Sequence, residues 1–439
     1  MPTPQSRRDF LRKSTALAGG LAISSQIAAK AHIDGADTIK IGLIGCGGRG
    51  TGAAFQALST EQNVQLVAMA DAFRDRLDKS YEGIKGQLAD NDLDAGRLNV
   101  AEENKFVGFE AYKKVIPLVD VLVIATPPGF RPIHFEAAVE ADKHVFMEKP
   151  LAVDAPGVRR VLKAAEVAKK KKLNVVVGLQ RHYQKKYTEG WVDMLQNGAI
   201  GDITASYVYW NSGGVWVRPR QEGQTEMEYQ MRNWYYFNWL CGDHINEQHI
   251  HNLDVGNWVK QDYPIKAEGF GGRHTRNGKE HGEIFDNHAV QFTYADGSVM
   301  NSQCRHWRGA AKKVTEAFQG TNGSAPSPGK IMTKSGYTLL NHNDRKDPNP
   351  YQLEHDLLFA AIAKGDYKFA DAENGAKSTM TAILGRMATY SGQIISWDDA
   401  INSNLDLSPK KYAFDAEAPV LPLASGYYPI PVPGETKVM

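Results

Sequence analysis

The chain has 439 residues, which is too long for one ordinary hydrophobic core and therefore predicts two domains. Hydrophobic residues make up 42% of the chain and charged residues 23%, which are the proportions of a soluble globular protein. The formal net charge of +1 gives no electrostatic basis for binding nucleic acid or an anionic membrane, so neither partner is expected.

The N-terminal segment has the features of an export signal. Residues 6–13 contain a paired arginine in a basic context, and residues 15–29 form a mildly apolar run rich in alanine and glycine. Ala29 and Ala31 then provide an A-x-A cleavage pattern. We therefore expect residues 1–31 to be a twin-arginine signal peptide, with a periplasmic mature protein that has no membrane segment after processing.

A glycine-rich turn follows a short apolar strand at residues 39–44. The turn matches G-x-G-x-x-G, whose glycines allow a tight turn, close approach of a pyrophosphate and close packing of the next helix. A second apolar strand, residues 64–70, ends in Asp71, where a carboxylate would bind the ribose hydroxyls of NAD. Asp71 would also repel a 2′-phosphate, which favours NAD(H), although Arg74 leaves NADP(H) open. The expected cofactor contacts here are Gly45, Cys46, Gly47, Gly48, Arg49, Gly50, Asp71 and Arg74.

Two later strands of this region also end in residues that can face a ligand. One apolar run ends at Thr126 and Pro127, and a shorter run ends at Glu148 and Lys149. Ligands of open parallel sheets bind at the carboxyl ends of the strands. The sequence therefore predicts a Rossmann domain over residues 38–185, whose remaining cofactor contacts are Thr126, Pro127, His134, Glu148 and Lys149.

The pattern changes after residue 185. Short apolar runs separated by turns that contain glycine, asparagine or aspartate predict a mostly antiparallel open sheet. A long helical pattern over residues 243–260 interrupts these strands, and the proline-rich residues 408–439 are expected to form an extended arm. We therefore predict an α/β protein in which an α+β domain over residues 186–407 follows the Rossmann domain. The expected strands are 203–210, 265–271, 289–294, 299–307 and 314–320, and further helices are expected over 351–363 and 374–394.

Three side chains have the chemistry needed for hydride transfer. Removing a hydride from a carbinol requires a base for the hydroxyl proton and a donor that holds the oxygen. Lys149 can serve as this donor, and a continuous helix would place Glu247 one turn before His251, so that the carboxylate orients the imidazole. A divalent metal held by His244, Glu247 and His251 is an alternative. Because hydride transfer needs no metal and no further ligands are evident in the sequence, we expect none.

The glycine loop, the sequence Glu148-Lys149-Pro150 and residues 242–254 together resemble the sugar and inositol dehydrogenases of the Gfo/Idh/MocA family. The resemblance covers essentially all of the chain after the signal segment. It implies a Rossmann domain followed by an open-sheet domain, with the lysine beside the nicotinamide and the substrate hydroxyl. It also implies functional roles for Glu247, His251 and Asp254 on one helix. Glu247 departs from the aspartate that inositol-dehydrogenase-type members have at this position.

We expect an oxidoreductase with tightly bound NAD(H) that acts on a secondary alcohol of a sugar, glycoside or cyclitol. The alternatives are a glycoside hydrolase that oxidises its substrate transiently with bound NAD, and a sugar-binding protein that keeps the cofactor without turnover. Because free NAD is scarce in a periplasm, the arm of the same or a neighbouring subunit is expected to cover the cofactor, which favours a homodimer or homotetramer. The aromatic residues of 234–239 could face a sugar or belong to the core. The expected substrate contacts are Lys149, Arg181, His182, Arg232, Glu247, His251 and Asp254.

Overall fold

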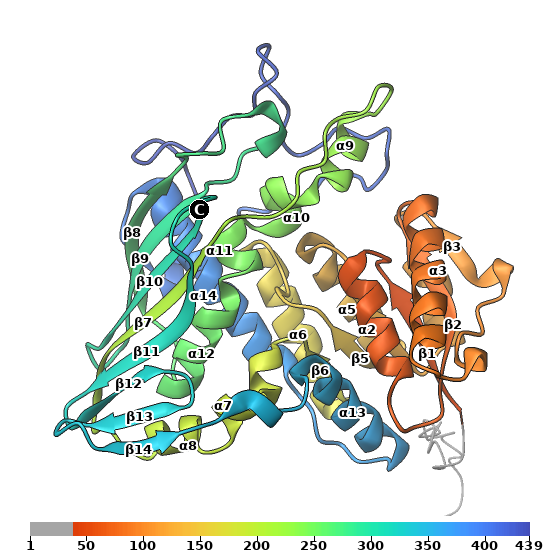
Figure 1. Cartoon of the computed structure of the whole chain (residues 1–439). Helices are drawn as coiled ribbons and strands as arrows, with labels where there is room; N and C mark the ends of the chain where they lie inside the picture. Colours follow the sequence, from red (N-terminus) through yellow and green to blue (C-terminus); the bar gives the residue numbers. More distant parts are fainter. Residues whose placement is uncertain (1–37) are drawn as a thin grey trace, which may run out of the picture.

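The computed structural model describes residues 38–439, which form two α/β units that meet along one side (Figure 1). The expected signal peptide, residues 1–31, lies outside the described residues. None of the helices within residues 38–439 combines the length and the apolar character needed to cross a membrane.

A six-stranded parallel sheet forms the N-terminal unit, with the strand order β3-β2-β1-β4-β5-β6. The order reverses between β1 and β4, and an open sheet binds ligands in the crevice at such a point. The strands are β1 (Ile39–Ile44), β2 (Val64–Asp71), β3 (Lys105–Val107), β4 (Val121–Ile124), β5 (His144–Met147) and β6 (Val175–Val177). The helices are α2 (Gly48–Leu58), α3 (Arg74–Asp90), α4 (Tyr112–Val115), α5 (Arg131–Glu140) and α6 (Ala155–Lys171).

The apolar runs of the sequence account for this sheet. All four residues of β4 are buried, so the strand has no polar face, as expected where helices cover both sides of a parallel sheet. Gly42 of β1 allows close packing, because a Cβ there would lie 2.4 Å from Val115 Cγ1. Asp154 begins α6 as its N-cap, and its carboxylate accepts a hydrogen bond of 2.8 Å from the backbone N–H of Gly157.

A nine-stranded sheet forms the C-terminal unit, with the order β14-β13-β12-β11-β7-β10-β9-β8-β15. All registered pairs are antiparallel except β7 with β10, which confirms the expected fold class. The predicted strands correspond to β7 (Ile203–Ser212), β8 (Lys266–Gly272), β9 (Asn287–Thr293), β10 (Val299–His306) and β11 (Lys313–Gly320). Four short strands of this sheet were not predicted from the sequence: β12 (Gly323–Ser327), β13 (Lys330–Thr333), β14 (Thr338–Asn341) and β15 (Ile395–Ser396).

Helices cover the face of this sheet that is turned toward the N-terminal unit (Figure 1). Val208 of β7 and Met300 and Cys304 of β10 are buried on this inner face. Helix α14 is buried along most of its length, because it packs on both β8 and α6 and so joins the two units. The helices are α7 (Lys185–Thr188), α8 (Trp191–Gln196), α9 (Glu226–Arg232), α10 (Asn238–Cys241), α11 (His244–Glu247), α12 (Ile250–Lys260), α13 (Pro350–Ala363), α14 (Ala372–Ser391) and α15 (Trp397–Ile401).

Helix α13 comes late in the chain but packs on the N-terminal unit. Its Leu358 and Phe359 belong to the same buried apolar cluster as Ile41 and Leu43 of β1, and the helix contacts α2. Part of the segment that the sequence analysis assigned to the second domain thus completes the core of the first.

Residues 402–439 contain no helix or strand and run over both units. The Leu407 N–H donates to the Asp154 carboxylate at 2.9 Å, and the Gly434 N–H donates to the Ser391 carbonyl at 2.7 Å. Between these anchors the ring of Phe414 packs on Phe73, with 5.2 Å between the ring centroids. The proline-rich arm therefore lies against the N-terminal unit where β2 ends.

Candidate active site

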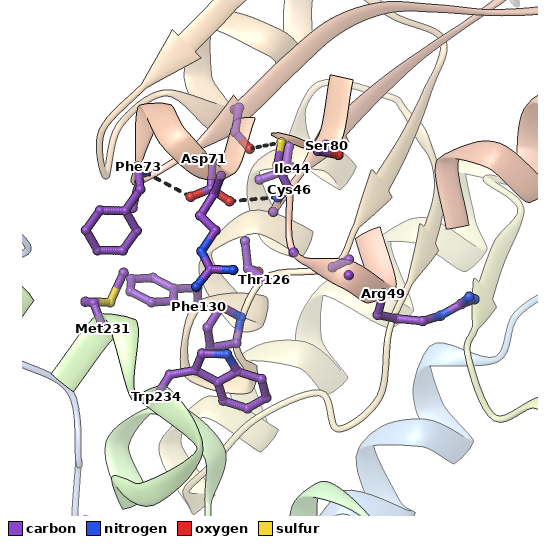
Figure 2. Close-up of a pocket in the computed structure, with 18 of the residues that line it drawn as sticks. Ile44, Cys46, Arg49, Asp71, Phe73, Ser80, Thr126, Phe130, Met231 and Trp234 are labelled. Carbon is purple, nitrogen blue, oxygen red and sulfur yellow. Dashed lines mark hydrogen bonds between the residues drawn. The ribbon is translucent and has the colours of Figure 1, made fainter. Parts of the chain in front are cut away.

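A cavity of about 650 Å³ lies over the glycine loop at the carboxyl edge of the first sheet (Figure 2). A Cβ at Gly47 or Gly48 would meet nothing within 4 Å, so the loop presents open backbone to this cavity. A Cβ at Gly50 would instead lie 1.9 Å from the Gly45 carbonyl oxygen, which keeps α2 close to the turn. Both properties fit a pyrophosphate at the N-terminus of α2.

Asp71 and Cys46 lie together at one side of the cavity (Figure 2). The Asp71 carboxylate accepts hydrogen bonds from the backbone N–H groups of Cys46 at 2.7 Å and Phe73 at 2.9 Å. Burial raises the pKa of Asp71 above its ordinary value. The Cys46 thiol is buried and donates to the Ala70 carbonyl at 3.4 Å, and burial raises its pKa well above the ordinary value, so it fills space rather than reacts.

The structure corrects the predicted cofactor contact of Arg74. Its guanidinium is half-exposed and lies 3.4 Å from Glu102 and 3.6 Å from Asp78, outside the cavity. Helix α3 begins at this residue, and Arg76 and Lys79 of the same helix are among the basic side chains that line the cavity.

The end of β4 forms the far wall of the cavity, and the end of the neighbouring strand β5 lies outside the cavity lining. Thr126 and Pro127 line the cavity together with His134, whose Nδ1 is 3.2 Å from Thr126 Oγ1. Burial lowers the pKa of His134 to about 3, so the ring is uncharged. Buried Arg131, which the sequence analysis missed, donates to the Thr126 and Pro150 carbonyls and thereby ties the two strand ends together.

Arg49 and Glu148 were both expected to touch the cofactor, and the structure pairs them with each other. Arg49 extends away from Asp71 (Figure 2) and donates to the Glu148 carboxylate. The same guanidinium lies 3.3 Å from Glu354 and stacks over the Tyr351 ring at 4.9 Å, both in α13. Arg49 thus links the glycine loop to the residue that precedes Lys149.

Lys149 and Glu247 meet across the boundary between the units, although 98 residues separate them in sequence. The Lys149 ammonium donates to the Glu247 carboxylate at 3.0 Å and also to the Glu247 carbonyl. Both side chains keep limited solvent access, at 12% and 15% exposure. A ligand that enters this boundary can therefore reach the ammonium.

The predicted continuous helix over residues 243–260 is wrong, because α11 ends at Glu247 and α12 begins at Ile250. The intervening side chains bond to the sheet: Gln248 Oε1 is 2.7 Å from His306 Nε2, and His249 Nε2 is 2.8 Å from Ser302 Oγ. The break corrects the expected role of Glu247, which holds Lys149 and makes no hydrogen bond to His251 within the described residues.

His251 is buried near the Lys149 charge. Its Nδ1 has no hydrogen-bond partner among residues 38–439, and its ring stacks on Trp210 of β7 with 5.9 Å between centroids. Burial, together with the nearby Lys149 charge, holds the pKa of His251 well below its ordinary value. The imidazole is therefore a free base that can accept a proton.

The His251 environment predicts a flat acid side of the pH profile. We expect kcat/KM to change less than about two-fold between pH 7.5 and about pH 6, whereas a base with an ordinary histidine pKa of about 6.5 would lose roughly three-quarters of its active form there. Initial rates of the NAD-loaded protein in overlapping buffers measure this, with the melting temperature at each pH as the control. An acid limb centred near pH 6.5 would contradict the assignment of His251 as the base.

Asp254 and His182 form a second pair beside this site. His182 Nε2 is 2.7 Å from the Asp254 carboxylate, which also accepts from Asn374 at 3.0 Å and Ser378 at 2.8 Å. Burial opposes a charge on His182, but the Asp254 carboxylate overrides this effect and raises the pKa of His182. Trp258 stacks on the same ring at 4.0 Å. Asp254 thus orients His182, which retains partial exposure.

Two arginines predicted to bind substrate have other partners. Arg181 is buried and forms an ion pair with the fully buried Glu316 of β11, so its guanidinium has a structural partner in the core. Arg232 lines the nucleotide cavity and bonds Asp75 of α3 through two nitrogens at 3.1 and 3.2 Å. Arg232 therefore lines the cofactor cavity and does not lie in the substrate site where it was predicted.

Residues of the second unit also line the nucleotide cavity. Met231 and Trp234 face Phe73 and Phe130 of the first unit across it (Figure 2). The aromatic residues of segment 234–239 therefore have two locations. Trp234 lines the cavity, whereas the aromatic residues that follow it pack in a buried cluster. This part of the cavity lining was not evident in the sequence, since Met231 and Trp234 follow Asp71 by more than a hundred positions.

The alternative metal trio of His244, Glu247 and His251 is not brought together. Within residues 38–439, the one group of three ligands close enough for a metal is Asp243, His244 and His288. The Asp243 carboxylate already accepts from the His244 ring at 2.8 Å, the Phe285 N–H at 2.9 Å and the Tyr390 hydroxyl at 2.5 Å. The structure therefore supports a hydrogen-bond network for this buried group.

Comparisons with known proteins agree with this architecture. Residues 39–179 match the family profile GFO_IDH_MocA, described as "Oxidoreductase family, NAD-binding Rossmann fold". The chain is 26% identical over 372 residues to an inositol 2-dehydrogenase of Serratia proteamaculans, covering 82% of this chain and 96% of that protein. It is 25% identical over 356 residues to an inositol 2-dehydrogenase of Cereibacter sphaeroides, covering 79% and 92%.

Solved structures share the fold over the same part of the chain. The aldose-aldose oxidoreductase of Caulobacter crescentus aligns with a TM-score of 0.62 at 16% identity, covering 82% of this chain and 99% of that one. The scyllo-inositol dehydrogenase of Lactobacillus casei, solved with NAD(H) and scyllo-inositol, aligns with a TM-score of 0.60 at 20% identity, covering 82% and 100%. The chain thus has an NAD-binding Rossmann domain that matches this oxidoreductase family, and over about four-fifths of its length it is similar to inositol 2-dehydrogenases.

Proposed function

We propose that this chain transfers a hydride between a retained NAD(H) and a secondary alcohol of a sugar, glycoside or cyclitol. The observation that carries the proposal is the contact of Lys149 with Glu247 at the boundary between the nucleotide-binding unit and the open-sheet unit, near the unpaired imidazole of His251. The named substrates of the relatives, inositol among them, support this substrate class.

Each residue of the site has a separate task in the proposed reaction. The nicotinamide, when bound, accepts or returns the hydride. Lys149 Nζ holds the carbinol oxygen with a charged donor, and His251 takes the hydroxyl proton. Glu247 positions the Lys149 ammonium through the bond of 3.0 Å, and Arg49 holds Glu148 so that the strand end carrying Lys149 stays in place.

A substrate panel tests the proposal directly. The purified protein is supplied with NAD and, in turn, myo-inositol, scyllo-inositol, D-glucose and methyl β-D-glucopyranoside, and the absorbance of the reduced nicotinamide is followed. Net formation of NADH with at least one compound is the expected result. Release of methanol from the glycoside without net NADH would point to hydrolysis by transient oxidation instead. Saturable binding without any turnover would point to a sugar-binding protein.

Cofactor retention is the finer part of this proposal, and the arm supports it. Phe414 packs on Phe73 and Phe109, both of which line the cavity, with 5.2 and 4.8 Å between ring centroids, and Tyr412 packs on Phe130 at 5.4 Å. Because aromatic pairs contribute about 0.5–1.5 kcal/mol each, the arm stiffens the wall behind the cofactor.

We expect the double variant Tyr412→Ala and Phe414→Ala to lose bound NAD(H) about ten-fold faster than the wild type, which corresponds to about 1.4 kcal/mol. Cofactor per protein after timed dialysis and denaturation measures the loss. Tyr427→Ala, in an exposed part of the arm, is the matched control and should retain the wild-type amount. Equal retention in all three proteins would place the retaining contacts outside the arm.

We propose that the protein is exported folded, with its cofactor already bound, because the N-terminal sequence has the paired Arg7-Arg8 and the A-x-A pattern of a twin-arginine signal. Cell fractionation of the wild type and of a variant with Arg7→Lys and Arg8→Lys tests this, and a cytoplasmic wild type would contradict it. A homodimer or homotetramer is also proposed, since no helix of residues 38–439 covers the outer face of the nine-stranded sheet, where Phe270 is 74% exposed (Figure 1). Light scattering of the purified protein measures the assembly.

A further inference from the structure

The inner end of β7 places an indole beside the proposed base. Trp210 stacks on His251 with an interplanar angle of 24°, and its Nε1 is buried with no hydrogen-bond partner among residues 38–439. Trp210 follows Val208 by two positions, so both side chains lie on the inner face of the sheet, beneath α12. The indole N–H is therefore a free donor within the site.

Tyr235 lies near the Glu247 charge. Its ring stacks on His306 at 6.0 Å, and His306 bonds Gln248, the residue that follows Glu247. The Tyr235 side chain is 2% exposed, and its hydroxyl also lacks a partner within residues 38–439. Burial and then the nearby Glu247 charge raise the pKa of Tyr235 well above its ordinary value, so the hydroxyl keeps its proton.

Buried polar groups of folded proteins are normally hydrogen-bonded, because leaving one unpaired forfeits its hydration without compensation. Here Trp210 Nε1, Tyr235 Oη and His251 Nδ1 are all unpaired. Trp210 stacks on His251, which lies near the Lys149 charge, and Tyr235 lies near the Glu247 charge. Elsewhere in the described C-terminal unit, a buried tyrosine such as Tyr294 has a partner, since its hydroxyl donates to Asn257 at 2.9 Å. Other buried polar atoms of both units also lack partners, but these three lie near Lys149 or Glu247, where a ligand with several hydroxyls would supply the missing partners.

We propose that Trp210 Nε1–H and the Tyr235 hydroxyl bind substrate hydroxyl groups that flank the reacting carbinol, so that the site selects polyols over alcohols with a single hydroxyl. This inference rests on the proposed function and assigns two residues to the recognition of its substrate. The selectivity has a physical basis, because a site built to bond a hydroxyl rejects an analogue that leaves its polar groups unpaired.

The test separates recognition from chemistry and from folding. Tyr235→Phe removes only the hydroxyl and keeps the ring on His306, and Trp210→Phe removes the N–H and keeps an aromatic ring on His251. KM and kcat are measured for myo-inositol and D-glucose, with cyclohexanol as the comparator that has one hydroxyl. We expect each variant to raise KM for the polyols about 10- to 100-fold, with kcat within about three-fold and an unchanged melting temperature.

Tyr294→Phe is the matched control, because it removes a buried hydroxyl that has a partner outside the site. It should lower the melting temperature and leave KM unchanged. A wild type that turns over a polyol, with unchanged KM in both Tyr235→Phe and Trp210→Phe, would overturn the inference alone. A lower melting temperature with unchanged KM would show that the two groups are structural and would also overturn it. A wild type that neither turns over nor binds any polyol would overturn the proposed function as well.

Discussion

Replacing Lys149 with alanine is expected to lower turnover by about two to four orders of magnitude while the amount of bound NAD(H) stays near that of the wild type. The expectation follows from position: the Lys149 ammonium is the charged donor at the boundary between the units, and Glu247 already orients it at 3.0 Å. Removing it leaves the carbinol oxygen without a partner as charge develops. Single-turnover rates and the cofactor content of the purified variant measure the two quantities.

The same loss of turnover is expected for His251→Ala, because its unpaired imidazole lies near the Lys149 charge. Lys185→Ala is the matched control: this lysine is 40% exposed and pairs with Glu189 at 2.8 Å on the surface, so its loss should leave the rate unchanged. Near-native rates for Lys149→Ala or His251→Ala would remove that residue from the mechanism. A parallel loss of cofactor would show instead that the residue holds the dinucleotide.

The glycine loop gives the second large effect, because two of its glycines are needed for different reasons. Gly50→Ala places a Cβ 1.9 Å from the Gly45 carbonyl oxygen, a backbone atom that cannot move aside cheaply. We expect this variant to lose about 1–3 kcal/mol of stability and to bind no measurable NAD. Gly47→Ala meets no protein atom within 4 Å, so it should fold like the wild type and yet bind NAD at least about ten-fold more weakly.

Gly86→Ala separates these effects from the general consequence of replacing a glycine. Gly86 lies inside α3 with nothing within 4 Å of an added Cβ, so the change should preserve NAD binding and stabilise the helix by about 0.5–1 kcal/mol. Thermal unfolding and titration with NAD are measured for all three variants. Normal NAD affinity in Gly47→Ala would mean that the pyrophosphate does not approach this part of the loop.

The buried network of Arg49 connects these two results. Its guanidinium reaches Glu148 beside Lys149 and Glu354 of α13, so the glycine loop, the end of β5 and the late helix are held by one cation. Burial raises the pKa of Glu354 well above its ordinary value, whereas Glu148 lies directly against the Arg49 guanidinium. A rigid connection of this kind keeps Lys149 in register with the cofactor loop.

Features that depend on neighbouring residues along the chain, such as turns and buried strands, could be predicted from the sequence. The turn after β1 requires glycine at Gly45, whose φ is +96°, and at Gly50, where a Cβ would overlap the backbone. The glycines in the sequence therefore predict this turn. The continuous burial of β4 likewise required an apolar run of that length. These features depend on neighbours along the chain, and for that reason the Rossmann domain, its cofactor loop and the approximate strands of the second sheet were predictable.

Contacts between distant segments were decided only by the tertiary structure. The helical spacing of Glu247 and His251 suggested a local pair, but Gln248 and His249 gain hydrogen bonds from the sheet by interrupting the helix, and this turns Glu247 toward Lys149. Arg181 and Arg232 likewise found partners, Glu316 and Asp75, that lie more than a hundred residues away. A side chain's partner depends on which surfaces pack together, and spacing along one helix or strand does not contain that information.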